Sequence, residues 1–317
     1  MPNELSVGKF ARMDHLIPDQ PLFFADESRG VISVEGEEAR NFLQGLVSND
    51  VTKAGPDRAI YAALLTPQGR YLHDFFIAAG PNDALWLECE AERRQDLMRL
   101  LMIYRLRAKA RIADRQGLIV LRFYGTGVLE LLQLPAVPGA ARMQDEGVVF
   151  VDPRRAELGA HAILPQAAAV ALTSALSFRP GSVETYDRLR LSLGVPDGSR
   201  DLEIEKALPM ESGLDALHGI DWEKGCYVGQ ELTARMKYRA LVKKQLLSVT
   251  IEGPAPEPGT PVLLGETEAG VMRTARNGYG LALLRLDKAE EAGDQPLTAG
   301  QAKIRVLRSA DAPQRKA

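Results

Sequence analysis

Cys226 is the residue with the greatest potential for chemistry, because it lies between glycines in the segment Trp222-Glu-Lys-Gly-Cys-Tyr-Val-Gly-Gln-Glu231. Glycine removes side-chain cover and permits positive φ, so the backbone can turn sharply here and expose the thiol. Lys224, Arg235 and Lys237 are near in sequence, and their positive charge would stabilise a thiolate and raise its reactivity. These residues indicate equally a reactive thiolate or a cysteine buried in a glycine-rich turn.

The second cysteine, Cys89, is expected to be a packing residue. In the strand expected at 84–89, alternation places it on one face with Leu85 and Leu87, opposite Trp86 and Glu88. Free cysteine is among the most buried residue types. The chain has only these two cysteines and no Cys-x-x-Cys pair, so we expect no disulfide framework, which fits a reducing compartment.

Other chemical motifs are absent or incomplete. The chain has no GxxxxGK[ST] phosphate loop and no GxSxG nucleophile elbow. Gly125-Thr-Gly127 begins a dinucleotide-binding pattern, but Glu130 replaces the third glycine, so a strand-to-helix turn is the simpler interpretation. The histidines lack metal-ligand spacing, and we expect no resident metal site. They are His15, His73, His161 and His218.

The composition is that of a soluble folded protein. Of 317 residues, 45% are hydrophobic and 26% are charged, which excludes disordered and fibrous classes. A formal charge of -3 argues against nucleic acid and anionic membranes as partners, and no apolar run is long enough to cross a bilayer. Glu4 and Asp14 count against a targeting peptide, so a cytoplasmic location is expected.

The first 240 residues mix helix and strand without regular βα alternation, which indicates an α+β fold rather than a doubly wound sheet. Ser182 is a plausible N-cap for a helix that stops near Gly194. Further helices are expected at 37–47 and 91–104, and strands at 31–34, 59–65, 71–78 and 84–89.

The residues after position 240 are predicted to form a separate small β domain. Gly253-Pro-Ala-Pro-Glu-Pro-Gly259 disfavours both helix and central strand, so a junction or rigid turn is expected there. Short strands separated by turn residues predict an antiparallel barrel or sandwich. They are expected at 243–251, 262–264, 270–276, 279–286 and 302–308.

The chain resembles a known family at its most distinctive segment. Lys224-Gly-Cys-Tyr-Val-Gly-Gln-Glu231 matches the KGC[YF]xGQE signature of the YgfZ-type folate-binding proteins, in the iron–sulfur assembly and repair branch of the glycine-cleavage T-protein (aminomethyltransferase-like) superfamily. Three further segments resemble motifs of that family, so the similarity spans roughly residues 24 to 285. They are Gly36–Asp50, Leu65–Arg70 followed by Asp74, and Tyr104–Lys109.

The resemblance implies a T-protein-like three-lobed ring with a C-terminal antiparallel β-barrel. Residues 1–240 would form a folate-binding region of two intertwined α+β lobes, and 241–317 the barrel. The implied function is that of a tetrahydrofolate-binding factor, which assists iron–sulfur cluster assembly or repair in client enzymes. One thiolate is too few to hold a cluster, so any transient cluster would be shared with an iron–sulfur client or carrier protein. A monomer is expected.

The resemblance also assigns roles by position. Cys226 becomes the redox-active thiolate or transient metal ligand, with Lys224 and Arg235 beside it. For the folate, Arg239 is a candidate for the glutamate tail together with Arg235, and Glu211 for the pterin edge. The full set of expected folate contacts is Asp74, Glu211, Tyr227, Gln230, Glu231 and Arg239.

One departure from the family weighs against the alternative function, a folate-dependent aminomethyl or one-carbon transferase. Transferases of the superfamily carry a pair of acids in the first hairpin, whereas this chain has His73-Asp74. Proton transfer from a folate nitrogen needs a placed acid or base, so the loss of one carboxylate disfavours that chemistry. Asp74 is interpreted equally as a ligand contact or a structural cap. A scaffold in which Cys226 merely packs is the remaining alternative.

Overall fold

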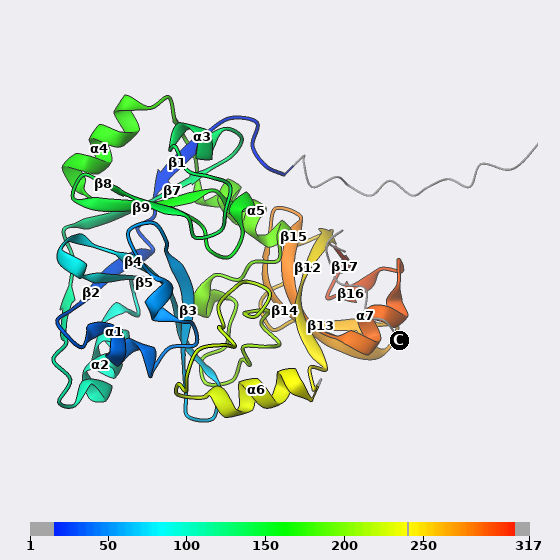
Figure 1. Ribbon diagram of the computed structural model, residues 1–317. Coiled ribbons are helices and arrows are strands. Elements are labelled where there is room, and N and C mark those ends of the chain that lie inside the picture. Colours follow the sequence, from blue (N-terminus) through cyan, green and yellow to red (C-terminus); the bar gives the residue numbers. More distant parts are fainter. Residues whose placement is uncertain (1–15, 240, 308–317) are drawn as a thin grey trace, which may run out of the picture.

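The protein is described by a computed structural model covering residues 16–239 and 241–307. In these residues the strands form two open sheets and one closed barrel, and Figure 1 shows the barrel to one side of the two sheets. The α+β class and the C-terminal antiparallel barrel expected from the sequence are both confirmed. The expected strand residue Arg308 lies outside the described residues.

The first sheet has five strands in the order β3-β4-β5-β2-β6. Helices α1 and α2 pack against its outer face, because the residues that they bury belong to the same apolar cluster as that face. The elements are β2 (Arg29–Glu35), α1 (Ala39–Gln44), β3 (Ile60–Leu65), β4 (Tyr71–Ala79), β5 (Leu85–Glu90), α2 (Arg94–Arg105) and β6 (Arg111–Asp114).

The second sheet repeats this topology. Its strand order, given from the opposite edge, is β8-β9-β10-β7-β1-β11. The first four strands correspond in order to β3, β4, β5 and β2 of the first sheet. The last strand, β11, corresponds to β6, and β1 is an additional strand inserted before it. Helices α3 and α4 join its outer apolar cluster. The elements are β1 (Leu22–Ala25), β7 (Leu118–Tyr124), α3 (Val128–Leu131), β8 (Ala141–Gln144), β9 (Gly147–Val151), β10 (Ala160–Pro165), α4 (Gln166–Ala175) and β11 (Arg179–Pro180).

Both faces of the sheets are buried, and strand alternation sorts the side chains between them. In β5, Leu85, Leu87 and Cys89 join the outer cluster with α2, whereas Trp86 joins the core between the two sheets. The packing role expected for Cys89 is therefore confirmed, and burial raises the pKa of this thiol to about 12. The inert cysteine is thus distinguished from Cys226, which is exposed.

After the two sheets, the chain continues through a helix and a long loop into the barrel. Ser182 caps α5 (Val183–Ser192) as expected, since its hydroxyl accepts from the Thr185 amide. A long irregular segment then leads to α6 (Gln230–Tyr238). The barrel contains β12 (Lys244–Glu252), β13 (Pro261–Leu264), β14 (Thr267–Arg276), β15 (Tyr279–Arg285), α7 (Leu286–Ala292), β16 (Leu297–Ala299) and β17 (Ala302–Val306). Short 3-10 turns occur at Val51–Lys53, Pro81–Asp83, Ala156–Leu158 and Gly198–Arg200.

The barrel closes with six strands, one more than the sequence predicts, because the short β16 was not anticipated. We propose that the domain boundary lies between residues 240 and 241. All the barrel strands follow that point, and residue 240 itself lies outside the described residues. Among the described residues no helix is long and apolar enough to cross a membrane.

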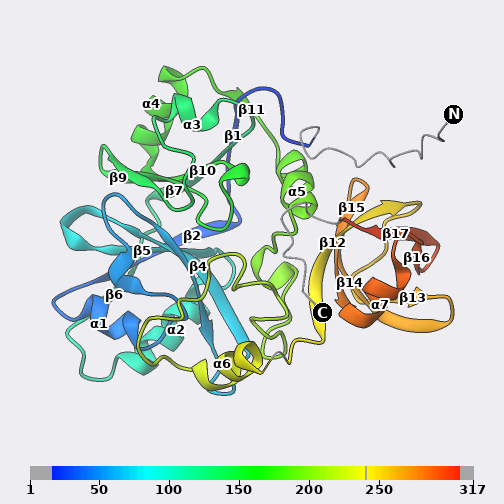
Figure 2. The ribbon, with the colours of Figure 1, turned by 45° about the vertical axis from the view of Figure 1, so that its right-hand side comes forward.

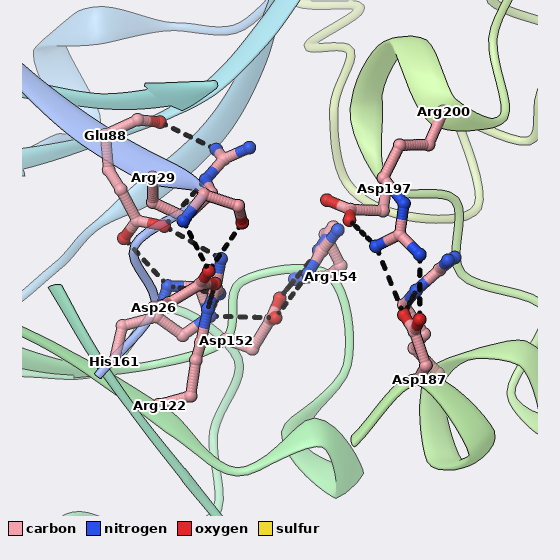
Figure 3. Close-up of polar contacts among 12 residues, drawn as sticks. Asp26, Arg29, Glu88, Arg122, Asp152, Arg154, His161, Asp187, Asp197 and Arg200 are labelled. Atoms are coloured by element: carbon pink, nitrogen blue, oxygen red, sulfur yellow. Dashed lines mark hydrogen bonds and ion pairs between the residues drawn. The ribbon is translucent and has the colours of Figure 1, made fainter. Parts of the chain in front are cut away.

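Buried ion pairs join the inner faces of the two sheets (Figure 3). Glu88 of β5 accepts from Arg29 of β2 and from Arg122 of β7, with a distance of 3.0 Å to the Arg122 guanidinium. His161 of β10 lies between two carboxylates, with its Nδ1 2.9 Å from Glu88 and its Nε2 3.0 Å from Asp152. We call this set the central ion network. Its members are Asp26, Arg29, Glu88, Arg122, Asp152, Arg154 and His161.

A second set of ion pairs attaches the barrel. Asp187 on α5 pairs with Arg190 and Arg200, and also with Arg276 of β14 at 3.1 Å. Arg190 in turn pairs with Asp201 at 2.7 Å. The Arg190 contacts are shielded from water, which strengthens them, whereas Arg200 and Arg276 approach the buried Asp187 from the partly exposed side. Helix α5 therefore connects the sheets to the barrel (Figure 2).

His73 and Asp74, adjacent on β4, face opposite sides of the first sheet. His73 lies under α2, with its Nε2 3.1 Å from an Asp96 oxygen, and burial lowers its pKa to about 4. Asp74 faces inward, where its oxygens accept from the hydroxyls of Tyr61 at 2.8 Å and Tyr71 at 2.7 Å. These two positions therefore do not act as a pair.

We predict that Glu88→Gln will lower the free energy of unfolding by about 3 kcal/mol at neutral pH, because it leaves buried arginines without their carboxylate. Burial alone would raise the pKa of Glu88, but Arg122, His161 and Arg29 lower it well below its usual range. The pKa of Glu88 is thus lower in the folded protein than in the unfolded chain, where it is about 4.3. Ionised Glu88 therefore stabilises the fold at pH values above about 4.3, and this stabilisation is lost as the pH falls further.

Denaturant unfolding at several pH values tests this prediction. The loss of unfolding free energy in Glu88→Gln relative to the wild type should reach its full value of about 3 kcal/mol above pH 5 and should shrink in acid. Glu37→Gln is the control, because it breaks an exposed pair with Lys109 and should change stability little. An equal deficit for the two variants would contradict the structural role assigned to Glu88.

Candidate functional site

The exposed thiol of Cys226 lies in an irregular loop, 221–229, that precedes α6. The sequence left open whether this cysteine is exposed or buried, and the structure resolves the question in favour of exposure. A Cβ added to Gly225 would meet no atom within 4 Å, so the backbone beside the thiol borders open space. The sulfur is therefore accessible to a partner.

Lys224 anchors this loop rather than activating the thiol. Its ammonium donates to the carbonyls of Gln44, Val47 and Asn49 at 2.9, 2.6 and 2.8 Å, just after α1. An ammonium has three donors, and all three are used here. Burial lowers the pKa of Lys224 to about 8, which still leaves the amine mostly protonated at neutral pH. Lys224, two residues before Cys226, thus fixes the loop to the backbone of the first lobe.

Further contacts hold the loop on the same segment. The Asp221 carboxylate accepts from the amides of Glu223 and Lys224 and pairs with Lys53. The Val228 amide donates to the Gly45 carbonyl at 3.3 Å. The loop that carries Cys226 therefore rests on residues 44–53, which belong to the expected Gly36–Asp50 motif and its continuation.

The turn of the first hairpin also contacts the loop. Gly229, with φ of 84°, approaches the turn so closely that a Cβ on it would lie 2.5 Å from the Thr66 carbonyl oxygen. A Cβ on Gly69, with φ of 71°, would lie 2.8 Å from the Gly229 carbonyl oxygen. Both the left-handed conformation and the close backbone approach require glycine. Three separate sequence motifs thus meet around the thiol loop.

The other predicted site residues near Cys226 lie in its loop, along α6 or just after it. Arg235 pairs with Glu231 at 2.7 Å across one helical turn, on the exposed face. Gln230 begins α6 and Arg239 follows its last turn. Tyr227 is buried with the Lys224 ammonium 5.1 Å from its ring centre, and burial raises the pKa of its hydroxyl to about 12. These residues therefore lie close to the thiol loop, and their roles as ligand contacts stay predictions.

Glu211 and Asp74 lie in other places. The carbonyl of Glu211 accepts from the Leu246 amide at the start of the barrel, and burial raises the pKa of its side chain. Asp74 is buried beneath Tyr61 and Tyr71, and burial raises the pKa of this carboxyl too. Their assignment as folate contacts stays a prediction.

A cavity of about 520 Å³ adjoins the base of the thiol loop, a size typical of sites for small molecules. It combines aromatic, apolar, acidic and basic side chains. None of the six expected folate contacts lines it, nor does Cys226. Its lining residues are Asn49, Lys53, Arg58, Ala59, Ile60, Tyr61, Val137, Pro138, Pro153, Asp215, His218, Ile220, Asp221, Trp222 and Glu223.

The lining carries aromatic, acidic and basic groups. Trp222 is partly exposed and its indole donates to Asp215, whereas the Tyr61 side chain is fully buried in the wall of the cavity. The carboxylates of Asp215 and Glu223 and the cationic groups of Lys53 and Arg58 also line it, and Lys53 pairs with Asp221. Sequence reasoning missed this site, although Trp222 lies only two residues before the signature. Within the described ranges no group of three or more metal-ligating side chains occurs.

We predict that Lys224→Met will destabilise the protein by about 2 kcal/mol, because it leaves buried carbonyls without donors. Hydrogen exchange of amides in 221–229 should accelerate, since the loop loses its main anchor. Lys243→Met serves as control, as this lysine is exposed. Unchanged exchange in Lys224→Met would show that the ammonium does not hold the loop.

Comparison with known proteins agrees with this architecture. The family model for the CAF17 C-terminal beta-barrel domain matches residues 243–314, and that for the GCVT N-terminal domain matches 24–164. The glycine cleavage system aminomethyltransferase T from Bartonella henselae superposes with a TM-score of 0.75 over 94% of this chain and 88% of that one. Its 16% identity shows a shared fold alone.

Closer relatives are mitochondrial iron-sulfur cluster assembly factors named IBA57. The Mus musculus protein is 32% identical over 288 residues, which span 83% of this chain and 77% of the relative. The Homo sapiens protein is 32% identical over 84% of this chain and 78% of the relative. The T-protein superfamily is thus confirmed, whereas the narrower YgfZ assignment is not.

The relatives correct one expectation. A cytoplasmic location is contradicted, because these relatives are named as mitochondrial proteins. The expectation depended on Glu4 and Asp14, both outside the described residues, and two acidic side chains carry too little information to establish a compartment. By its similarity over most of its length, and by its two lobes and barrel, this chain belongs to the IBA57 family of the T-protein superfamily.

Proposed function

We propose that this protein takes part in iron–sulfur cluster assembly, with Cys226 as one ligand of a cluster that a partner protein also holds. The observation that carries the proposal is the exposed thiol on an anchored loop, in a chain whose relatives are named iron-sulfur cluster assembly factors. Soft thiolate ligands favour iron–sulfur clusters, and a ligand that is already positioned binds at a lower entropic cost.

The chemistry is an exchange of ligands. Cys226 loses its proton and its sulfur bonds to an iron atom, while a thiolate of the partner leaves that iron and takes up the proton. No electron is transferred, and the cluster is the cargo. Cys226 has no second cysteine near it, because Cys89 is buried under α2. The other ligands must therefore come from the partner.

We further propose that the 520 Å³ cavity binds a reduced folate. The support is the partly exposed ring of Trp222, the carboxylates of Asp215 and Glu223, which suit the donors of a pterin, and the cations of Lys53 and Arg58, which suit a carboxylate tail. The T-protein fold adds to this support. The cavity and the thiol loop share the segment 221–223, so a bound folate would contact the base of the loop. Its proposed role is to stabilise the loop in the conformation that presents the thiol.

A one-carbon transferase is the weaker candidate. Its acid would be Asp74, but both Asp74 oxygens accept from buried tyrosine hydroxyls and the residue does not line the cavity. His73, the neighbour that replaces the second acid, faces α2 on the other side of the sheet. Neither side chain is directed at a ligand in the cavity.

The thiol is tested in cells that lack the native gene and express either Cys226→Ser or Cys89→Ser. The chain has only these two cysteines, so each variant is the matched control of the other. Cys226→Ser should abolish the activity of iron–sulfur enzymes such as aconitase while leaving the thermal midpoint unchanged. Cys89→Ser should retain the activity, apart from any loss caused by lower stability. Full activity in Cys226→Ser would refute the proposal.

The folate is tested with Trp222, which lines the cavity, while Trp86, the only other tryptophan, lies in the core. Tetrahydrofolate should quench tryptophan fluorescence saturably. In Trp222→Phe the quenching should disappear while calorimetric binding persists, and Arg58→Glu should weaken that binding about tenfold or more by repelling the tail. Absence of calorimetric binding in the wild type would exclude this role for the cavity.

A further inference from the structure

Helix α2 exposes a row of large apolar side chains that the fold itself does not bury. Met102, Ile103 and Leu106 are 50, 55 and 84% exposed, whereas Leu97 and Leu101 of the same helix are fully buried. Residues three and four positions apart share a helix face, so these three form one continuous strip. We call Met102, Ile103 and Leu106 the α2 stripe.

The conformation of Leu106 reinforces this observation. It ends α2 with φ of 46°, a left-handed conformation that glycine adopts far more readily than leucine. Contiguous apolar patches on a protein surface mark interaction sites, whereas single apolar residues need no explanation. Leu106 is thus a large, exposed leucine at a position suited to glycine, which favours a role in binding.

The stripe has a positively charged border. Arg105 and Arg107 are exposed on either side of Leu106, and no ion pair is formed by either within the described ranges. Arg99 and Lys109 extend the border, although each has an acidic partner. A second copy of this chain, docked symmetrically, would place arginine opposite arginine, which is unfavourable. The complementary surface is therefore apolar with carboxylates around it.

The stripe lies on the same side of the molecule as the thiol loop. Val228 of that loop and Tyr104 of α2 pack against the same outer apolar cluster of the first sheet. In both ribbon views α1, α2 and α6 lie along the lower end, whereas α4 lies at the opposite end (Figures 1 and 2). Helix α2 and the thiol loop therefore border one apolar cluster at this end of the molecule.

We propose that the α2 stripe is the docking surface for the protein that shares the iron–sulfur cluster with Cys226. That partner would present apolar side chains flanked by Asp or Glu. The inference rests on the proposed function, which supplies the shared cluster. Apolar contact at the stripe would provide affinity, and the arginine border would speed association and fix the orientation of the partner.

The test introduces a carboxylate into the stripe with Ile103→Glu. The matched control is Val170→Glu on α4, where the valine is 59% exposed at the far end of the molecule. Full-length proteins are expressed in cells that lack the native gene, and aconitase activity is measured. Ile103→Glu should reduce activity about tenfold, whereas Val170→Glu and the conservative Ile103→Leu should retain it. Thermal midpoints should be unchanged, because these side chains are exposed.

A photocrosslinker at position 103 identifies what contacts the stripe. Capture of an iron–sulfur protein, at a segment with apolar and acidic residues and with yields that fall as salt is raised, would support the proposal. Capture of a second copy of this chain would overturn it. So would binding of the purified protein to phosphatidylcholine–cardiolipin vesicles that Ile103→Glu abolishes, since the occupant would then be a membrane.

Cys226→Ser and Ile103→Glu together distinguish a failure of the docking surface from a failure of the proposed function. If Cys226→Ser abolishes aconitase activity and Ile103→Glu leaves it intact, the docking surface is refuted while the proposed function stands. If neither variant changes the activity, the proposed function fails and the docking proposal fails with it.

Discussion

Charges that are removed from water must be paired within the protein, and this constraint organises the space between the two sheets. Glu88 receives Arg29 from its own sheet and Arg122 from the other, while His161 connects Glu88 to Asp152 (Figure 3). A displacement of one sheet against the other would leave buried charges unpaired. The central ion network thereby determines how the two lobes face each other, and so where the residues of the cavity meet.

The network extends to the cavity through Arg154. This guanidinium pairs with Asp152 and lies 5.5 Å from the centre of the Tyr61 ring, and Tyr61 lines the cavity. The same arginine donates to the carbonyl of Pro196 just beyond α5, beside the ion pairs that attach the barrel. One buried set of charges thus supports the cavity wall and the contact with the third lobe.

Local patterns were sufficient to predict most elements. Alternation predicts β5 and the faces of its residues, and Ser182 is recognisable as a cap, whereas the glycines around Cys226 left exposure and burial equally open. The partners of charged side chains were not predictable, because they lie far away in sequence. Lys224 was expected to activate the thiol, yet its three acceptors come from residues 44–49, a segment that only the tertiary fold brings beside it. The duplicated topology was missed for a related reason, since the two lobes share strand order rather than a recognisable sequence repeat.

The contact between Gly229 and the 66–69 turn has a mechanical consequence. Two stretches of main chain touch there with no side chain between them, so no rotamer can adjust to absorb a displacement. The hairpin tip and the start of α6 must therefore shift together. A displacement of the hairpin would therefore move Gly229, three residues from the exposed Cys226, and this joint couples the first lobe to the thiol loop.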